Sequence, residues 1–248
     1  MALKRSVFVL KGGKMDKILH FFGTILGVFD GPTNNLVGSC AIVCMILKFL
    51  FATMTNRYYS IPVLSEELKP QLDNIKKKYA KTPEKLTKAI SDFLVSVKYP
   101  FASYAVYYLL MLAVGTFIAL ATHSPEKYVE GFAPEASRAF LMIPDVTEYT
   151  IVSLKSFWPD INMLRYMILP VLACALQYVQ DAYMSKKSLV SKTWFDYSSL
   201  AVTFAACLIL PQTFSVFWFI YELGNMIHIT TNIRLAKNKN VKTKRNEK

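Results

Sequence analysis

The chain has 248 residues, of which 53% are hydrophobic and 14% aromatic, and its formal net charge is +12 at pH 7. Its mean hydropathy of +0.30 is too high for an ordinary globular protein. The apolar residues form blocks with charged residues at their edges, which indicates an integral membrane protein oriented in a bilayer and excludes a typical nucleic-acid-binding protein.

The first 14 residues are expected to be a leader or a disordered N-terminus. Residues 1–17 carry five basic side chains, too many for an end that crosses the membrane: Lys4, Arg5, Lys11, Lys14 and Lys17. Two explanations are open. Translation begins at Met15, or the segment is a short leader, for which no A-x-A-like cleavage site lies at the expected place.

Residues 15–30 are predicted to form an amphipathic helix that lies in the membrane interface. The run 18-ILHFFGTILGVF-29 is too short to span a bilayer, and its apolar side chains recur at helical spacing. The tripeptide Asp30-Gly31-Pro32 is expected to break this helix before the first span. The alternative is an uncleaved leader or a sixth span.

Five apolar stretches are candidates for membrane spans, since a bilayer core of about 30 Å needs about 20 apolar residues in a helix. Four of them meet or nearly meet that length: about 35–55, 99–122, 163–184 and 212–233. The fifth, 197–210, holds about 14 residues, or roughly 21 Å of helix. It is either a short span or a buried re-entrant piece, and the charge pattern favours a span.

The loop charges predict the orientation of these spans. Segment 57–98 carries nine basic residues against five acidic ones, the tail 234–248 carries seven against Glu247 alone, and the loop 185–195 contains three lysines. The connection 123–162 reverses this bias, with six acidic residues against three basic ones. By the positive-inside rule the first three segments are cytoplasmic and the connection is extracellular. Five spans with the N-terminus outside and the C-terminus in the cytoplasm satisfy this pattern.

The cytoplasmic segment 58–97 is predicted to be a hairpin of two helices. One apolar stripe follows helical spacing on a charged background: Leu64, Leu68, Leu72, Ile75 and Tyr79. Pro83 is well placed in the first turn of a second helix, whose stripe is formed by Leu86, Ile90, Phe93 and Leu94. Two antiparallel helices would bury these stripes against each other. The alternative, a solvated linker, is disfavoured because linkers lack sustained stripes.

Five side chains at membrane depth are candidate site residues, because polar groups in lipid are costly: Lys48, Gln177, Gln180, Trp218 and Glu222. Lys48 lies about 12 residues into its helix, and the alternative is that its stem snorkels to the cytoplasmic surface. Gln177 shares a helix face with Asp181, which could also be an interfacial cap. Glu222 is expected to line a cavity or to pair with a cation such as Lys48.

The residues needed for covalent or metal chemistry are missing from the sequence. The four cysteines lie inside apolar segments without a CxxC spacing, and the three histidines are scattered. No nucleophile–base pair, phosphate-binding loop or dinucleotide fingerprint occurs. We therefore expect no enzyme activity, no metal and no cofactor.

Several segments together resemble the YidC/Oxa/Alb family of membrane protein insertases over about residues 18–240. They are 46-ILKFLF-51, 62-PVLSEELKPQLDNIKKKYAKTPEKL-86, 140-FLMIPD-145, 169-LPVLACALQYVQ-180 and 209-ILPQTFSVFWFIYELGN-225. Their order, spacing and topology carry the resemblance. The chain departs from the family pattern in having a lysine where an arginine is usual. The Gly-Asn pair that normally follows soon after the tryptophan also comes later, at Gly224-Asn225.

The resemblance implies an all-α, polytopic membrane protein whose five-span core encloses a water-filled groove, open to the cytoplasm and to lipid. Lys48 takes the place of the groove arginine, Gln180 that of a groove glutamine and Trp218 that of a tryptophan facing the groove. The implied activity is insertion and folding of client membrane proteins in the plasma membrane, without covalent chemistry. The implied partners are nascent membrane proteins, lipids, a Sec-type translocon and, through the basic tail, the ribosome, but not DNA.

Two other classes of protein are weighed against an insertase. A small secondary transporter could use Lys48 and Glu222 as an intramembrane relay, but transporters usually contain internal repeats, and no convincing repeat is found. A membrane-embedded enzyme is disfavoured because the necessary nucleophile and metal spacings are absent.

Overall fold

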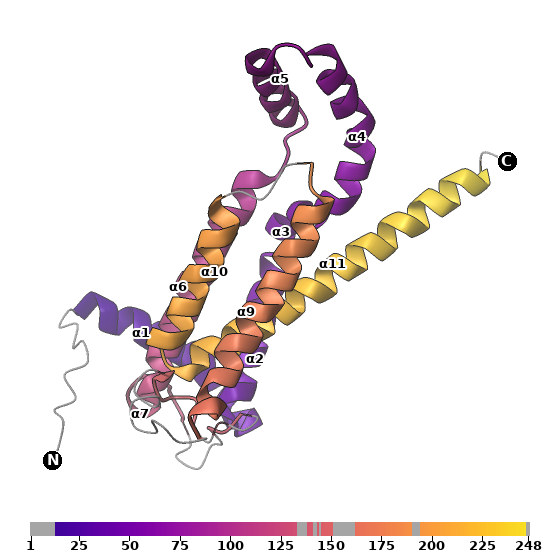
Figure 1. Cartoon of the computed structure of the whole chain (residues 1–248). Helices are drawn as coiled ribbons and strands as arrows, with labels where there is room; N and C mark the ends of the chain where they lie inside the picture. The colour runs from indigo at the N-terminus through magenta and orange to yellow at the C-terminus, as the bar shows by residue number, and fades with distance from the viewer. Residues whose placement is uncertain are drawn as a thin grey trace. The chain divides into compact units, whose positions relative to one another are not determined.

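The computed structural model describes residues 13–132, 138–140, 143, 145–150, 162–189 and 194–246. The described chain is helical, apart from two isolated bridges, Phe140 with Ile143 and Tyr149 with Pro211. Most of the expected leader, 1–14, lies outside these residues, as does much of the expected outer connection. The helices are α1 (Gly13–Thr33), α2 (Leu36–Leu50), α3 (Ala52–Tyr59), α4 (Ile61–Lys78), α5 (Pro83–Ser96), α6 (Phe101–His123), α7 (Pro125–Tyr128), α9 (Asn162–Lys187), α10 (Trp194–Ile209) and α11 (Gln212–Asn246) (Figure 1).

The chain divides into two compact units, and several helices contribute to both. The first unit comprises Met1–Cys44, Ala113–Pro170 and Ala206–Phe217. The second comprises Met45–Leu112, Val171–Ala205 and Trp218–Lys248. All five candidate site residues belong to the second unit, so it contains the residues of functional interest.

Helix α1 does not end at the expected breaker, because it continues through Pro32 to Thr33. A proline fixes a backbone angle that a helix accepts, and in the last turn it removes few hydrogen bonds. The helix ends instead at Asn34, which has a left-handed φ of 45° and donates its N–H to the carbonyl of Asp30 at 2.7 Å. The Asn35 side chain then accepts hydrogen bonds from the first N–H groups of α2. Two asparagines therefore make the break that the sequence assigned to Asp30-Gly31-Pro32.

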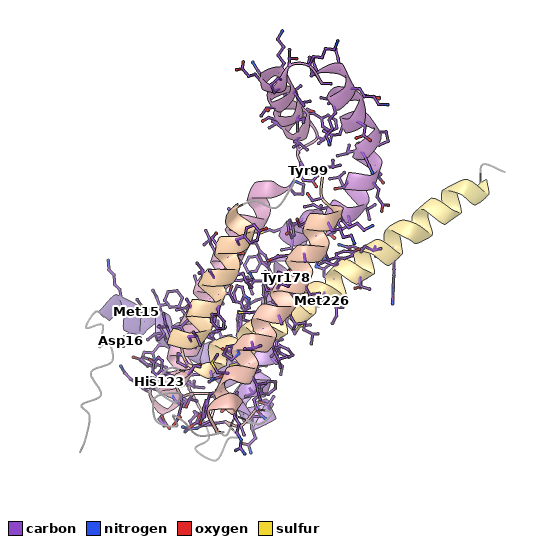
Figure 2. The ribbon with its side chains drawn as sticks, in the orientation of Figure 1. Met15, Asp16, Tyr99, His123, Tyr178 and Met226 are labelled. Carbon is purple, nitrogen blue, oxygen red and sulfur yellow. The ribbon has the colours of Figure 1, made fainter. Side chains whose placement is uncertain are left out.

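Within the first unit, α1 packs closely on the segment that follows α6. A Cβ atom placed on Gly23 would lie 1.9 Å from the carbonyl oxygen of Tyr128, and one on Gly27 would lie 2.1 Å from that of Glu130. At the start of α1, Asp16 accepts hydrogen bonds from the Tyr128 hydroxyl at 2.8 Å and from the Lys127 ammonium at 3.1 Å (Figure 2). The two glycines thus permit a backbone approach that any larger residue would block.

Gly23→Ala is expected to destabilise the protein by about 1–3 kcal/mol, because the added methyl group meets a backbone carbonyl that cannot rotate away. Gly13→Ala is the matched control, since a Cβ at Gly13 would meet nothing within 4 Å. Thermal unfolding of the purified protein in detergent measures the difference. Equal melting temperatures for the two variants would show that α1 does not need this close approach.

The first expected span, 35–55, is not one straight helix. Helix α2 ends at Leu50, and the chain bends by 65° before continuing as α3 and α4. No proline or glycine lies at the bend. In the first turn of α3, just after the bend, the Thr55 hydroxyl donates to the carbonyl oxygens of Phe51 and Ala52, each at 3.3 Å.

The number of spans follows only in part from helix length and composition. Within the described residues, one helical stretch, Ala105–His123 of α6, is long and apolar enough to cross a membrane by itself. The bent pair Leu36–Leu50 and Ala52–Lys78 is a second candidate if it is counted as one span, and Tyr197–Ile209 is apolar but short. The expected third span lies in α9, where the candidate residues Gln177 and Gln180 lower the hydropathy. The chain is all-helical as expected, while the count of five spans stays a prediction.

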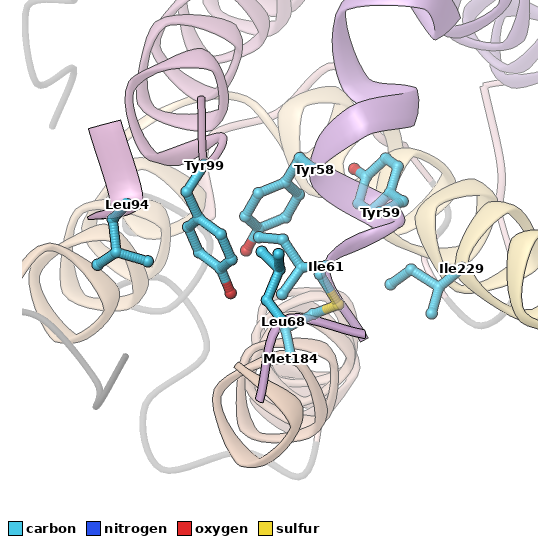
Figure 3. Close-up of a cluster of buried hydrophobic side chains, with 8 residues drawn as sticks. All are labelled: Tyr58, Tyr59, Ile61, Leu68, Leu94, Tyr99, Met184 and Ile229. Carbon is cyan, nitrogen blue, oxygen red and sulfur yellow. The ribbon is translucent and has the colours of Figure 1, made fainter. Parts of the chain in front are cut away.

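Helices α4 and α5 lie where the two apolar stripes predict helices, and they run antiparallel beside each other (Figure 1). Pro83 occupies the first turn of α5, as expected. At the base of this hairpin a hydrophobic cluster joins side chains from five helices and from the turn before α6. Figure 3 shows its members: Tyr58, Tyr59, Ile61, Leu68, Leu94, Tyr99, Met184 and Ile229.

The Tyr99 hydroxyl fixes this base with polar contacts in addition to packing. It lies 3.0 Å from the Ser65 hydroxyl of α4 and 3.0 Å from the Ser188 hydroxyl just after α9. It also accepts a hydrogen bond from the backbone N–H of Leu189 at 3.3 Å. Because Ser65 and Tyr99 are both buried, these bonds form away from competing water. The hairpin is therefore attached to the rest of the second unit at a defined point.

The expected last span, 212–233, and the expected tail, 234–248, are not separated by any break in the backbone. Helix α11 runs without interruption from Gln212 to Asn246, which is 35 residues. Its first residue is held within the first unit, where the Gln212 amide donates to the Thr150 hydroxyl at 2.9 Å and to the Tyr166 carbonyl at 2.7 Å.

Candidate functional site

Lys48 is buried near the end of α2, with 6% of its surface exposed. Its ammonium group donates a hydrogen bond to the side-chain oxygen of Asn225 on α11. It also lies 5.2 Å from the ring centre of Tyr59 and 5.3 Å from that of Tyr221, within the range of a cation–π interaction. The lysine therefore points into the second unit and does not snorkel to the surface.

Asn225 links Lys48 to the carboxylate of Glu222. The Asn225 amide nitrogen donates to Glu222 Oε2 at 3.1 Å, while its oxygen accepts from Lys48. Both Asn225 and Glu222 are fully buried. The sequence predicted that Glu222 would line a cavity or pair with a cation such as Lys48, and the structure connects the two charges through this amide. We call Lys48, Tyr59, Tyr221, Glu222 and Asn225 the Lys48 cluster.

Trp218 and Gln177 form a second group, one turn of α11 before Glu222. The Trp218 indole donates its N–H to Gln177 Oε1 at 3.1 Å, and Gln177 Nε2 lies 3.3 Å from the Ser199 hydroxyl oxygen of α10. The ring of Tyr108 packs edge-on to Trp218, with centroids 5.4 Å apart, and its hydroxyl donates to the Ser199 carbonyl at 2.7 Å. We call Tyr108, Gln177, Ser199 and Trp218 the Trp218 network.

The Trp218 network contacts the Lys48 cluster through aromatic rings. The ring centroids of Trp218 and Tyr221 are 5.0 Å apart, and the Tyr221 ring in turn flanks the Lys48 ammonium. The structure therefore brings together four of the five candidate residues, Lys48, Gln177, Trp218 and Glu222.

Among the candidate residues, Gln180 is the one that has no hydrogen bond to either group in the described chain. It is buried, and neither atom of its amide has a hydrogen-bond partner among the described residues. Its neighbour Asp181 is also buried, and its charge acts on Glu222.

The polar side chains of the Lys48 cluster are incompletely satisfied. Within the described residues, Oε1 of Glu222 is buried and has no hydrogen-bond partner, as is also true of the Gln180 amide. Native proteins leave few such atoms, because each costs about 1–3 kcal/mol unless water or a ligand pairs with it. The site can therefore accept additional polar partners.

Three members of the Lys48 cluster were missed by reasoning from the sequence: Tyr59, Tyr221 and Asn225. Aromatic residues in apolar segments are ordinarily core residues, and Asn225 was noted only as part of the displaced Gly-Asn pair and not as a site residue. A signal was nevertheless present, since Trp218, Glu222 and Asn225 follow the i, i+4, i+7 spacing of one helix face.

The chemistry that this arrangement supports is the binding of charged or polar groups. It offers a cation, a carboxylate, amide groups and aromatic faces in a buried setting. In the described part of the chain, no group of three or more histidine, cysteine, aspartate or glutamate side chains could hold a metal ion. A site of this kind suits the recognition of a charged or polar segment.

Gly224→Ala is expected to disturb the Lys48 cluster without unfolding the protein. A Cβ at Gly224 would lie 2.7 Å from Cδ and 2.9 Å from Cε of Lys48. Because these atoms belong to a flexible side chain, the lysine can move aside, and the hydrogen bond between Lys48 and Asn225 would then be lost. We expect a melting temperature close to that of the wild type. We also expect a loss of activity similar to the loss caused by replacing Lys48 with alanine. A fully active Gly224→Ala protein would show that the position of Lys48 is not critical.

A model of the family described as 60Kd inner membrane protein matches residues 28–242. The matched range covers most of the chain and includes the Lys48 cluster and the Trp218 network. No curated protein matches the chain.

Proposed function

Because the chain belongs to this family, the YidC/Oxa/Alb insertases, we propose that it inserts client membrane proteins through the polar site around Lys48. The family comprises non-enzymatic insertases and chaperones of the inner or plasma membrane, which act on nascent membrane proteins. For this chain we propose an orientation in the membrane, a water-filled groove and the residues that bind the client.

The proposed orientation has five spans, with the N-terminus outside and the C-terminus in the cytoplasm. The connection 123–162 is extracellular, and the hairpin 58–97 and the tail 234–248 are cytoplasmic, in accord with the distribution of lysine and arginine. The helix predicted over 15–30 lies in the interface. The hairpin receives clients, and the basic tail contacts ribosomal RNA or a Sec-type translocon.

The observation that supports a groove is a set of unpaired buried polar atoms in the second unit. Oε1 of Glu222, which Asn225 links to Lys48, and the Gln180 amide have no hydrogen-bond partner in the described chain. Water is the partner that such atoms normally take. In the proposed mechanism the site fills with water from the cytoplasmic side, which lowers the cost of moving a client's polar tail into the membrane.

Insertion then requires no nucleotide and no covalent step. Lys48 attracts acidic or polar residues of the client, since a charge acts more strongly in a low-dielectric setting than in bulk water. The short apolar segment Tyr197–Ile209 thins the bilayer locally and shortens the path of the tail. The client's hydrophobic segment finally partitions sideways into lipid, and that transfer supplies the driving force.

Reconstitution tests this proposal directly. Liposomes that contain only this protein should insert a short single-span client, measured as protection of the client's tail from external protease, and empty liposomes should not. Single cysteines along 44–52 should react with a water-soluble reagent only from the cytoplasmic side. Failure of insertion, or reaction from both sides, would contradict the one-sided groove.

A secondary transporter is the second candidate function, and the link from Lys48 through Asn225 to Glu222 is the observation that favours it. Such a chain of polar groups could relay a proton or hold a substrate. Uptake of a small solute by proteoliposomes that do not insert clients would support the transporter and exclude the insertase.

A further inference from the structure

Glu222 is placed so that its charge competes with a client for Lys48. One of its carboxylate oxygens accepts a hydrogen bond from the Asn225 amide, whose own oxygen accepts from the Lys48 ammonium. The other oxygen, Oε1, has no partner in the described chain. The glutamate is fully buried within the protein, where a charge acts more strongly than it does in bulk water. Lys48 therefore already has a counter-charge that belongs to the protein itself.

The side chain of Asn225 transmits this effect because its amide has two different ends. Its oxygen faces the cation and its nitrogen faces the anion, which fixes the orientation of the amide between the two charges. A client carboxylate that binds Lys48 must approach both the Asn225 oxygen and the negative charge of Glu222.

We propose that Glu222, acting through Asn225, sets the charge preference of the clients. This inference rests on the proposed insertase function. The glutamate weakens the attraction of Lys48 for acidic tails and offers a partner to lysine or arginine in basic tails. A groove with a lone cation would favour acidic tails, whereas a groove that contains both charges accepts tails of either sign.

The test uses the full-length protein in phosphatidylcholine liposomes and three versions of one single-span client. The versions differ at two tail positions, which are both aspartate, both asparagine or both lysine. The measured quantity is the ratio of aspartate-tail to lysine-tail insertion. Glu222→Gln removes the charge and keeps the shape, and it should raise this ratio by roughly three- to tenfold, the range expected when one nearby charge is removed. Asn225→Asp adds a negative charge at the same place and should lower the ratio by a similar factor.

Glu130→Gln is the matched control, because it changes the net charge equally at an exposed position of the first unit and should leave the ratio unchanged. If Glu222→Gln and Asn225→Asp both fold and leave the ratio unchanged, the proposal is overturned. It is also overturned if insertion of all three clients falls by the same factor, because that result indicates a structural role for these residues. If Glu222→Gln does not fold, Asn225→Asp alone tests the proposal. A lower ratio of aspartate-tail to lysine-tail insertion supports the proposal, and an unchanged or higher ratio contradicts it. Insertion by the wild type with an unchanged ratio in the variants would leave the insertase function standing, whereas failure of the wild type to insert any client would refute that function.

Discussion

Replacing Lys48 by alanine should reduce the insertion of single-span clients with acidic tails by about tenfold or more, which corresponds to a loss of about 1.4 kcal/mol of attraction. The change removes the buried cation and leaves the Asn225 oxygen and the Glu222 carboxylate without it. Protease protection of the client tail in liposomes measures the effect. The loss should be smaller for clients with apolar tails, since those gain little from the charge.

Lys48→Arg is the control for this prediction, because it keeps the positive charge at the same position. A guanidinium group can also stack on aromatic rings, and Tyr59 and Tyr221 flank the site. We expect this variant to keep most of the activity. Normal insertion by a correctly folded Lys48→Ala protein would refute the role of the charge.

Trp218→Ala should be among the most destabilising single substitutions in the second unit, with a cost of about 3–5 kcal/mol. The indole is fully buried, packs against Tyr108 and Tyr221, and donates its N–H to Gln177. Alanine would leave a large cavity and an unpaired amide oxygen. Thermal unfolding in detergent should show a lower melting temperature, accompanied by loss of insertion.

Trp218→Phe separates packing from hydrogen bonding at this position. Phenylalanine fills much of the cavity but cannot donate to Gln177, so the expected cost is about 1–3 kcal/mol. A melting temperature for Trp218→Phe as low as that for Trp218→Ala would mean that the hydrogen bond dominates. If both variants resembled the wild type, the Trp218 network would not stabilise the protein.

The helical fold was predictable from the sequence because its apolar runs and stripes are long and regular. The hairpin is the clearest case, since its two stripes and Pro83 correspond to α4 and α5. The helix ends were harder to predict. The break after α1 depends on a left-handed Asn34 and a capping Asn35, and the bend after Leu50 occurs without a proline or a glycine. Hydropathy does not encode local features of this kind.

The part of the candidate site that was predictable consists of charged residues that lie inside apolar segments of the sequence. Lys48 and Glu222 are costly at membrane depth, and that cost alone drew attention to both. Asn225 carries no such signal, because its role depends on which side chains of α2 and α11 meet. The assignment of Gln180 came from the family resemblance, and the structure gives it burial without a hydrogen bond.

The continuity of α11 has a mechanical consequence. The helix extends from Trp218 and Glu222 to Asn246 without a break, a distance of about 40 Å at 1.5 Å per residue. An unbroken helix of this length behaves as a stiff rod, so a tilt of about 10° at the polar site displaces its far end by about 7 Å. Rotation of α11 when Lys48 or Glu222 changes its partner would therefore be carried as lever motion to the basic end of the chain.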